Sequence, residues 1–383
     1  MKIVYCIPSL QNPGGMERVL TEKVNFLSRN YGYDIAIITT EGSYKPYFLL
    51  DKKISIVNFN INFNSFFSAP LISKIILHNR RLCLYKTLLY NYLKDNSVDI
   101  CVSLCGKEID FLADLKDGSK KVAELHFARN FRKQFLLARK HGKFWELLGN
   151  IRTWQLKKTT QKLDAFVVLT KADLRIWQVS HSNVYQIYNP CIYSGEGLTS
   201  SLEKQKFLAI GKLDAQKGFD YLISAWKLVA TKYPNWTLCI FGQGEWKEKL
   251  SNMIRTFHLE NSVLLLGLTN DVKFEYLNSS GYIMSSRYEG FPMVLLEAMS
   301  FGLPIVSFDC ESGPNEIIDN GVNGFLVPSG DTDSLARYIL LLIEDITLRK
   351  KMGMMGKNKS TLFDMESIME QWNNLFLSLR YNR

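Results

Sequence analysis

Short runs of apolar, often β-branched residues alternate along the chain with longer stretches in which apolar residues recur at helical spacing. This alternation is typical of parallel sheets that are covered by helices. In the first half the expected strands are 3–7, 35–39, 100–104, 121–125 and 165–169. In the second half they are 207–210, 237–241, 263–266, 282–284, 304–308 and 324–327. The pattern therefore predicts an α/β protein with two sheet-containing halves.

The length of 383 residues also favours two domains, because one hydrophobic core seldom organises so long a chain. We expect the boundary at Asn189-Pro190-Cys191, where the polar stretch 194–205 follows and reads as a linker. The expected domains are 1–190 and 191–365. Residues 369–379 have helical periodicity, and we expect the segment 366–383 to pack back on the first domain as a helix.

The N-terminal run M-K-I-V-Y-C-I-P has an apolar core too short for a signal peptide, and no stretch of about 18 apolar residues predicts a transmembrane helix. A cytoplasmic protein, soluble or peripheral to the membrane, is expected. The seven cysteines are scattered and odd in number, which favours buried free thiols. Cys101 and Cys105 have no second Cys or His pair at metal-ligand spacing, so we expect no metal.

The net charge of +10 belongs to the first half, where residues 1–190 carry 28 Lys and Arg against 15 Asp and Glu. The rest of the chain carries 19 against 22. Such a charge predicts an anionic partner. No nucleic-acid-binding signature accompanies it, so nucleic acid is not expected. The stretch 63–93 mixes apolar, aromatic and cationic residues, as helices at an anionic membrane surface do, and a second basic stretch spans 120–162. The alternative is an ordinary amphipathic helix packed on its own domain.

Ligand sites of open α/β sheets lie beyond the carboxyl ends of the strands, so functional residues are expected in the loops there. After the first strand, Gly14 and Gly15 precede a helix expected to begin near Met16. Glycines let a ligand approach the backbone, and a helix N-terminus offers unpaired N–H groups to a phosphate or an oxyanion. A simple tight turn is the alternative. The sequence has neither the dinucleotide-binding fingerprint nor a Walker loop.

Two further loops suit a nucleotide diphosphate. The loop G-K-L-D-A-Q-K-G carries Lys212 and Lys217, whose ammonium groups can stabilise the charge of a departing diphosphate. The loop F-G-Q-G-E carries Gly242 and Gly244, where a base or ribose can lie against bare backbone. The alternative for the first loop is that its lysines are merely solvated, and the alternative for the second is an ordinary turn.

The most informative loop is S-S-R-Y-E-G-F-P-M-V-L-L-E-A-M-S-F-G-L-P, which follows the strand 282–284. Pro292 suits the first turn of a helix of about nine residues, and Gly302 suits its C-terminal cap. Glu289 then precedes the helix and Glu297 lies about one and a half turns inside it. Carboxylates so placed do not share a face as a metal or proteolytic dyad. They bracket the helix N-terminus and can bind the hydroxyl groups of a ligand whose phosphate lies between them. Further donor-binding residues are expected around them: Arg287, Gly290, Phe291, Met293 and Val294.

The E-x7-E spacing, the G-K-x4-K-G loop, the G-G-M-E-R turn and the N-P-C hinge together resemble the family-4 retaining glycosyltransferases, in order over nearly the whole chain. The resemblance implies a GT-B fold, in which two Rossmann-like domains face each other across a cleft and the C-terminal one holds most of the nucleotide-sugar donor. It implies retention of anomeric configuration without a metal or other cofactor. Glu289 is then expected to contact hydroxyls of the donor sugar, Glu297 those of the ribose, and Lys212 with Lys217 the diphosphate.

The same resemblance makes His126, in A-E-L-H-F-A-R-N, an active-site histidine near the donor hexose. The catalytic set expected is thus Lys212, Lys217, Glu289 and His126. Family members commonly have arginine where this chain has Lys212, and lysine keeps the charge but loses the bidentate fork. No residue presents itself as a carboxylate nucleophile, which favours front-face displacement over a double displacement.

The function expected is transfer of a hexose or N-acetylhexosamine from a nucleotide sugar, UDP-linked, to a polyprenyl-diphosphate-linked or other surface-glycan acceptor at the inner face of the cell membrane. Two alternatives remain open. One is a nucleotide-sugar hydrolase or epimerase of the same fold, and the other is a donor-binding scaffold without turnover.

Overall fold

The computed structural model describes residues 1–42, 45–66, 71–127, 143–194 and 197–381. The chain divides into two compact units. The first comprises Met1–Tyr188 with Glu366–Arg383, and the second comprises Asn189–Met365. The basic residues of the sequence that fall within 128–142, Arg129 and Arg132 among them, lie outside the described residues.

In the described part of the first unit, seven parallel strands form one sheet in the order β3-β2-β1-β4-β5-β6-β7. Their bounds are β1 Lys2–Ile7, β2 Asp34–Thr39, β3 Ser55–Asn58, β4 Ile100–Ser103, β5 Lys120–Leu125, β6 Ala165–Val168 and β7 Val184–Gln186. The helices are α1 Gly15–Tyr31, η1 Phe63–Phe66, α2 Leu71–Asp95, η2 Lys107–Asp110, η3 Leu112–Asp114, α4 Lys143–Thr160, α5 Lys171–Trp177 and α13 Met365–Tyr381.

The two strands that the apolar pattern does not predict, β3 and β7, are the two edges of this sheet. Their residues are only partly buried, whereas β4 and β6 are buried throughout. A central strand of a parallel sheet is covered on both faces and therefore shows a continuous apolar run, but an edge strand does not need one. The missing signal is thus a consequence of the position of these strands in the sheet.

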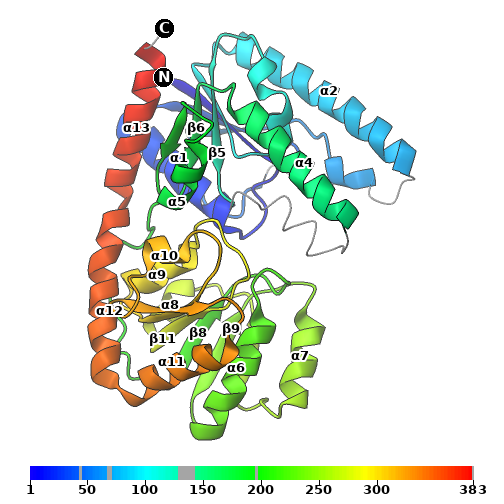
Figure 1. Cartoon of the computed structure of the whole chain (residues 1–383). Coiled ribbons are helices and arrows are strands. Elements are labelled where there is room, and N and C mark those ends of the chain that lie inside the picture. The colour runs from blue at the N-terminus through cyan, green and yellow to red at the C-terminus, as the bar shows by residue number, and fades with distance from the viewer. Residues whose placement is uncertain (43–44, 67–70, 128–142, 195–196, 382–383) are drawn as a thin grey trace. The chain divides into compact units, whose positions relative to one another are not determined.

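In the described part of the second unit, six parallel strands lie in the order β10-β9-β8-β11-β12-β13. Their bounds are β8 Lys206–Ile210, β9 Thr237–Phe241, β10 Val263–Gly267, β11 Gly281–Met284, β12 Ile305–Asp309 and β13 Gly324–Pro328. The helices are α6 Phe219–Lys232, α7 Lys247–Thr256, α8 Val272–Leu277, α9 Met293–Ser300, α10 Pro314–Ile317, α11 Thr332–Glu344, α12 Ile346–Ser360 and η4 Thr361–Phe363. Figure 1 shows the helices of each unit covering its sheet. The predicted α/β class with two parallel sheets is confirmed.

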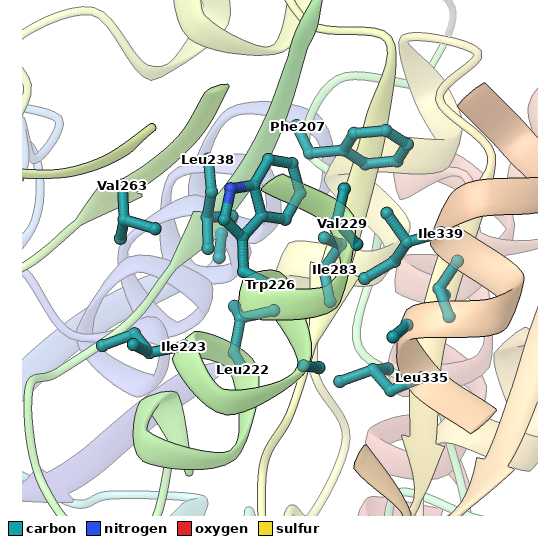
Figure 2. Packing of buried hydrophobic residues seen from close by; sticks show 14 of the residues in the cluster. Phe207, Leu222, Ile223, Trp226, Val229, Leu238, Val263, Ile283, Leu335 and Ile339 are labelled. Atoms are coloured by element: carbon teal, nitrogen blue, oxygen red, sulfur yellow. The ribbon is translucent and has the colours of Figure 1, made fainter. Parts of the chain in front are cut away.

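The core of the second unit is built around the fully buried Trp226 of α6. Figure 2 shows its indole among side chains from the sheet, with α11 supplying Leu335 and Ile339 from the neighbouring helix. Aromatic and branched side chains of this size each contribute about 1.5–3 kcal/mol when they are fully buried. This core fixes the strands whose carboxyl ends carry the loops described below.

The last helix, α13, packs on the first unit, to which its residues belong. Trp372 is buried, and the ammonium of Lys23 in α1 lies 3.7 Å from the centroid of its ring. Tyr33 donates a hydrogen bond to Asn373, and Arg380 lies 3.9 Å from Asp99. The C-terminal helix is therefore attached to the first unit by a buried tryptophan and by polar contacts.

Residues 197–205, the described part of the polar stretch that follows the expected boundary, make hydrogen bonds with the second unit. Ser200 is buried and donates a hydrogen bond of 2.6 Å to the carbonyl of Ser279, and Arg349 donates one of 3.1 Å to the carbonyl of Leu202. Residues 197–205 are therefore packed on the second unit. A polar composition is compatible with this because the hydrogen bonds satisfy the buried backbone groups.

All seven cysteines are free, and six of them are buried as predicted, whereas Cys83 in α2 is exposed. No helix among the described residues is long and apolar enough to cross a membrane.

Candidate active site

The loop between β11 and α9 has the local structure that its sequence predicts. The helix begins at Met293, directly after Pro292, and ends at Ser300. Gly302 lies two residues beyond the helix with φ of +73° and donates its N–H to the carbonyl of Met299. This left-handed conformation suits glycine and ends the helix. Glu289 accordingly precedes the helix and Glu297 lies within it.

Glu289 is buried, and two hydrogen-bond donors compensate for the loss of water around its carboxylate. Its Oε1 accepts hydrogen bonds from the ammonium of Lys217 and from the hydroxyl of Ser286, each 2.6 Å long. No residue of the described chain donates a hydrogen bond to Oε2. One edge of the carboxylate is thus fixed by the protein, while the other remains able to accept hydrogen bonds from hydroxyl groups of a ligand.

Glu297 has a separate partner. It is buried, and its Oε2 accepts a hydrogen bond of 2.8 Å from the hydroxyl of Tyr276, the last-but-one residue of α8. Tyr276 in turn stacks on Phe301, with ring centroids 5.4 Å apart. The two carboxylates thus accept hydrogen bonds from different donors, Glu289 before the helix and Glu297 within it.

The two lysines of the loop between β8 and α6 differ in their surroundings. Lys217 points to Glu289 and its side chain is 21% exposed. The side chain of Lys212 is 66% exposed and lies 3.7 Å from Asp214. The structure therefore brings Lys217 together with Glu289, but it records no contact of Lys212 with either residue among the described part of the chain.

The glycines of the loop after β9 are explained by the neighbouring loop. A Cβ at Gly242, whose φ is +150°, would lie 1.8 Å from the carbonyl oxygen of Gly211. A Cβ at Gly244 would lie 2.2 Å from the carbonyl oxygen of Leu213. Both positions need glycine because the loops after β8 and β9 pack backbone to backbone.

Of the other residues expected here, Arg287 forms an ion pair with Asp220 of α6, with Nη2 2.8 Å from Oδ2. Phe291 and Met293 are buried, and the ring of Phe291 lies 5.9 Å from that of Phe363. Gly290 is buried and Val294 partly so at the start of α9. The site loops after β8, β9 and β11 meet because these strands are neighbours in the sheet, with β8 between β9 and β11.

In the first unit, Gly14 precedes α1 and Gly15 is its first residue. A Cβ at Gly14 would lie 2.2 Å from Oε2 of Glu17, whereas nothing lies within 4 Å of one at Gly15. Glu17 is nearly buried, and burial raises the pKa of its carboxyl. A carboxylate in the first turn already interacts with the positive end of the helix dipole, so an anionic ligand would have to compete with it.

His126 directly follows β5 and belongs to a buried charged cluster. Its Nε2 lies 3.2 Å from Oε1 of Glu124, whose carboxylate also accepts hydrogen bonds of 2.5 and 2.6 Å from the ammonium of Lys23. Burial alone raises the pKa of Glu124, but the charges of Lys23 and His126 outweigh it and lower the pKa to about 2. Glu124 is therefore ionised beside the imidazole, whose buried Nε2 makes no hydrogen bond among the described residues.

Three residues that the sequence does not identify contact predicted site residues: Ser286 contacts Glu289, Tyr276 contacts Glu297 and Glu124 contacts His126. Ser286 and Glu124 lie close in the sequence to the residues that they contact, three residues before Glu289 and two before His126. Tyr276 lies 21 residues from Glu297 and has no such signal.

Relatives of the chain are glycosyltransferases. It is 32% identical over 378 residues to an uncharacterized glycosyltransferase of Haemophilus influenzae, covering 98% of this chain and 99% of that one. It is 29% identical to the amylovoran biosynthesis glycosyltransferase AmsD of Erwinia amylovora, over 98% and 99% of the two chains. It is 24% identical, over 99% of each chain, to a Campylobacter jejuni enzyme named for transferring N-acetyl-D-galactosamine to a diNAcBac-PP-undecaprenol-linked glycan.

Solved structures agree with this at the level of the fold. Sucrose-phosphate synthase of Thermosynechococcus elongatus matches with a TM-score of 0.82 at 16% identity, over 99% of this chain and 98% of that one. TarM of S. aureus, in a complex with UDP, matches with a TM-score of 0.78 at 17% identity, over 98% and 99%. The fold is thus GT-B. The family model of glycosyl transferases group 1 matches residues 196–359, which include the Lys217–Glu289 pair and α9, and the chain belongs to this family of glycosyltransferases.

Proposed function

We propose that this enzyme is a retaining glycosyltransferase of family 4 that transfers a hexose or N-acetylhexosamine from a UDP-sugar. The observation that supports this most is the Lys217–Glu289 pair beside the N-terminus of α9. Helix N-termini bind phosphate, and an ammonium and a carboxylate there suit a ligand that carries both a diphosphate and hydroxyl groups. Glu297 is the proposed partner of the ribose hydroxyls, and Lys212 assists Lys217 at the diphosphate.

The chemistry we propose is front-face displacement. The bond between the anomeric carbon and the β-phosphate oxygen breaks, and the acceptor hydroxyl oxygen forms its bond to that carbon on the same face. The hydroxyl proton passes to the departing diphosphate. The charge that builds on the diphosphate is stabilised by Lys217, whose ammonium Glu289 orients, and a group so placed contributes about 3–4 kcal/mol to lowering such a barrier. His126 is the proposed catalytic group of the first unit.

This proposal is tested by incubating the protein with a panel of UDP- and GDP-sugars and measuring release of the free nucleotide with and without candidate acceptors. We expect turnover with a UDP-sugar, faster with acceptor present. Retention is checked by NMR of the new glycosidic bond, which should have the anomeric configuration of the donor. An inverted product would overturn the retaining mechanism, and absence of binding to any nucleotide would overturn the site.

For the acceptor we propose a polyprenyl-diphosphate-linked glycan at an anionic membrane surface, reached during synthesis of a surface polysaccharide. The names of the Erwinia and Campylobacter relatives support this acceptor class. The charge of the first half, 28 basic against 15 acidic residues through residue 190, supports the membrane.

The surface proposed for the membrane is the outer side of α4. Leu147, Ile151 and Trp154 are exposed by 58, 43 and 58%, and their spacing of four and three places them on one side of the helix. Arg152 and Lys158 are exposed on the same helix. Both α4 and α2 pack on one face of the first sheet through the shared core that contains Leu156 and Leu89, so these outer side chains are not needed for that core. An apolar stripe flanked by cations suits the interface of an anionic bilayer.

Flotation with liposomes tests this surface. We expect binding to vesicles that contain anionic phospholipid at low salt, loss of binding at high salt, and weaker binding by Leu147→Ser/Trp154→Ser. The matched control is Leu228→Ser/Leu341→Ser, which removes two exposed leucines of the second unit. Equal flotation of both double variants would contradict the assignment to α4.

A hydrolase or epimerase of the same fold is the second candidate, because the Lys217–Glu289 pair suits the donor in either case. The panel above separates a hydrolase from a transferase, since a hydrolase releases nucleotide and free sugar at the same rate with and without acceptor. A scaffold without turnover would bind UDP and release nothing.

A further inference from the structure

Arg287 connects two loops of the second unit. Its guanidinium forms a fork on Asp220 in the first turn of α6, with Nη1 3.0 Å from Oδ1 and Nη2 2.8 Å from Oδ2. Nη1 also donates a hydrogen bond of 2.8 Å to the carbonyl of Ala215, and the guanidinium carbon lies 4.2 Å from the centroid of Tyr221. A bidentate pair that also stacks on an aromatic ring is well fixed in orientation.

The backbone around Arg287 makes the same connection. The N–H of Arg287 donates to the carbonyl of Gln216 over 2.7 Å, and the side chain of Gln216 donates to the carbonyl of Tyr288 over 3.1 Å. The hydroxyl of Ser285 donates to the carbonyl of Lys217 over 3.0 Å. Several hydrogen bonds thus connect the loop that carries Lys217 to the loop that leads to Glu289.

The fit between the two loops is close as well. Gly218 has φ of +61°, and a Cβ there would lie 2.1 Å from the carbonyl oxygen of Ser285 and 3.4 Å from Nη1 of Arg287. Only a residue without a side chain fits here, because both the backbone conformation and the space exclude a Cβ. The position of Lys217 relative to Glu289 is therefore set by the contacts of its neighbours as well as by their own ion pair.

We propose that Arg287, through its pair with Asp220, is a positioning residue that holds Lys217 at the site, and that it does not act as a ligand of the donor. This rests on the proposed function, since the position of Lys217 matters for turnover only if its ammonium meets the diphosphate. Loss of the fork would free the segment 215–218, and a misplacement of about 1 Å at a reacting group reduces turnover up to about 100-fold.

The test is a double-mutant cycle of Arg287→Ala, Asp220→Ala and the double variant, with Arg287→Lys as the conservative change. For a positioning pair we expect each single variant to lower kcat by about 10- to 100-fold, the double variant to be no worse than either, and lysine not to rescue because it cannot form the fork. If Arg287 instead bound the donor, Asp220→Ala would hardly change kcat and the effects of the two substitutions would add. Arg287→Ala would raise KM, and Arg287→Lys would restore part of the activity. That result would overturn the proposal.

Hydrogen exchange of the amides of 215–218 gives a readout that does not need activity. We expect faster exchange in Arg287→Ala and Asp220→Ala than in the wild type. The matched control is Lys249→Ala, which removes the other cation near Asp220, 3.9 Å away, without touching the loop, and should change neither exchange nor kcat by more than about twofold. If exchange responds but the wild type neither binds UDP nor turns over, the proposed function fails while the positioning role stands. Unchanged exchange in Arg287→Ala overturns the positioning role itself.

Discussion

The ammonium of Lys23 lies 2.5 Å from Oε2 of Glu124, and each side chain is only 1% exposed. The pair joins α1 to β5, and Oε1 of the same carboxylate faces His126. Trp372 of α13 covers the ammonium. A buried ion pair adds little to stability compared with a well-packed apolar pair, but removal of one partner leaves a buried charge uncompensated.

Lys23→Met should therefore destabilise the protein by about 3–5 kcal/mol, because Glu124 would remain buried without its counter-charge. The double variant Lys23→Met/Glu124→Leu should recover most of that loss. Urea denaturation of the three proteins provides the measurement. A double variant that is less stable than Lys23→Met alone would contradict this account of the pair.

The same carboxylate makes stability depend on acid pH. The pKa of Glu124 is lowered from its ordinary value of 4.5 to about 2 in the folded protein. A carboxyl with a lowered pKa contributes stability that is fully present above pH 4.5 and is lost as the pH falls towards 2. Glu124→Gln lacks this contribution, so its stability should depend less on pH between those values. The comparison is a series of denaturation curves for both proteins, and parallel pH profiles would argue against an ionised Glu124.

Glu289→Gln and Lys217→Ala should each reduce sugar transfer by about 100-fold or more, since each removes part of the charge arrangement at the proposed diphosphate site. The double variant should not be much worse than the more damaging single change, because the two groups form one ion pair. Thermal unfolding should confirm that the variants are folded. Near-wild-type turnover in either single variant would remove these residues from the active site.

Gly242→Ala should disturb the site without changing a polar group. The new Cβ would lie 1.8 Å from the carbonyl oxygen of Gly211, so the loops after β8 and β9 must separate. We expect a loss of stability of at least about 1 kcal/mol and weaker UDP binding, measured by calorimetry. Gly15→Ala is the control for stability, because nothing lies within 4 Å of a Cβ there. Unaltered stability and binding in Gly242→Ala would show that the loop packing is not needed.

Transfer should survive chelation. We propose that Lys217 and Lys212 supply the positive charge at the diphosphate that a divalent cation supplies in other enzymes, so activity should be within about twofold of normal after treatment with EDTA. The assay needs a parallel addition of Mg²⁺ and Mn²⁺. Activity that vanishes with EDTA and returns with either ion would contradict a metal-independent mechanism.

The apolar pattern of the sequence determines the α/β class, the two sheets and most of their strands, because central parallel strands are buried on both faces. It also determines that Glu289 and Glu297 stand on either side of the start of α9, since helix signals and the 3.6-residue turn are local. For the same reason the ends of α9 follow from Pro292 and Gly302 within one or two residues.

Only the tertiary structure decides which of these residues meet. Lys217 reaches Glu289 over 72 positions because β8 and β11 are neighbours in the sheet, and periodicity specifies which face of a strand is buried but not which strand lies beside it. From the sequence Arg287 is expected to bind the donor, and only the structure shows its bidentate pair with Asp220 of α6. Lys23 and Glu124 are 101 positions apart and are of types usually found at the surface, and only the structure shows them as a buried pair. The sequence around a charged residue, unlike an apolar periodicity, gives no signal of where its ion-pair partner lies.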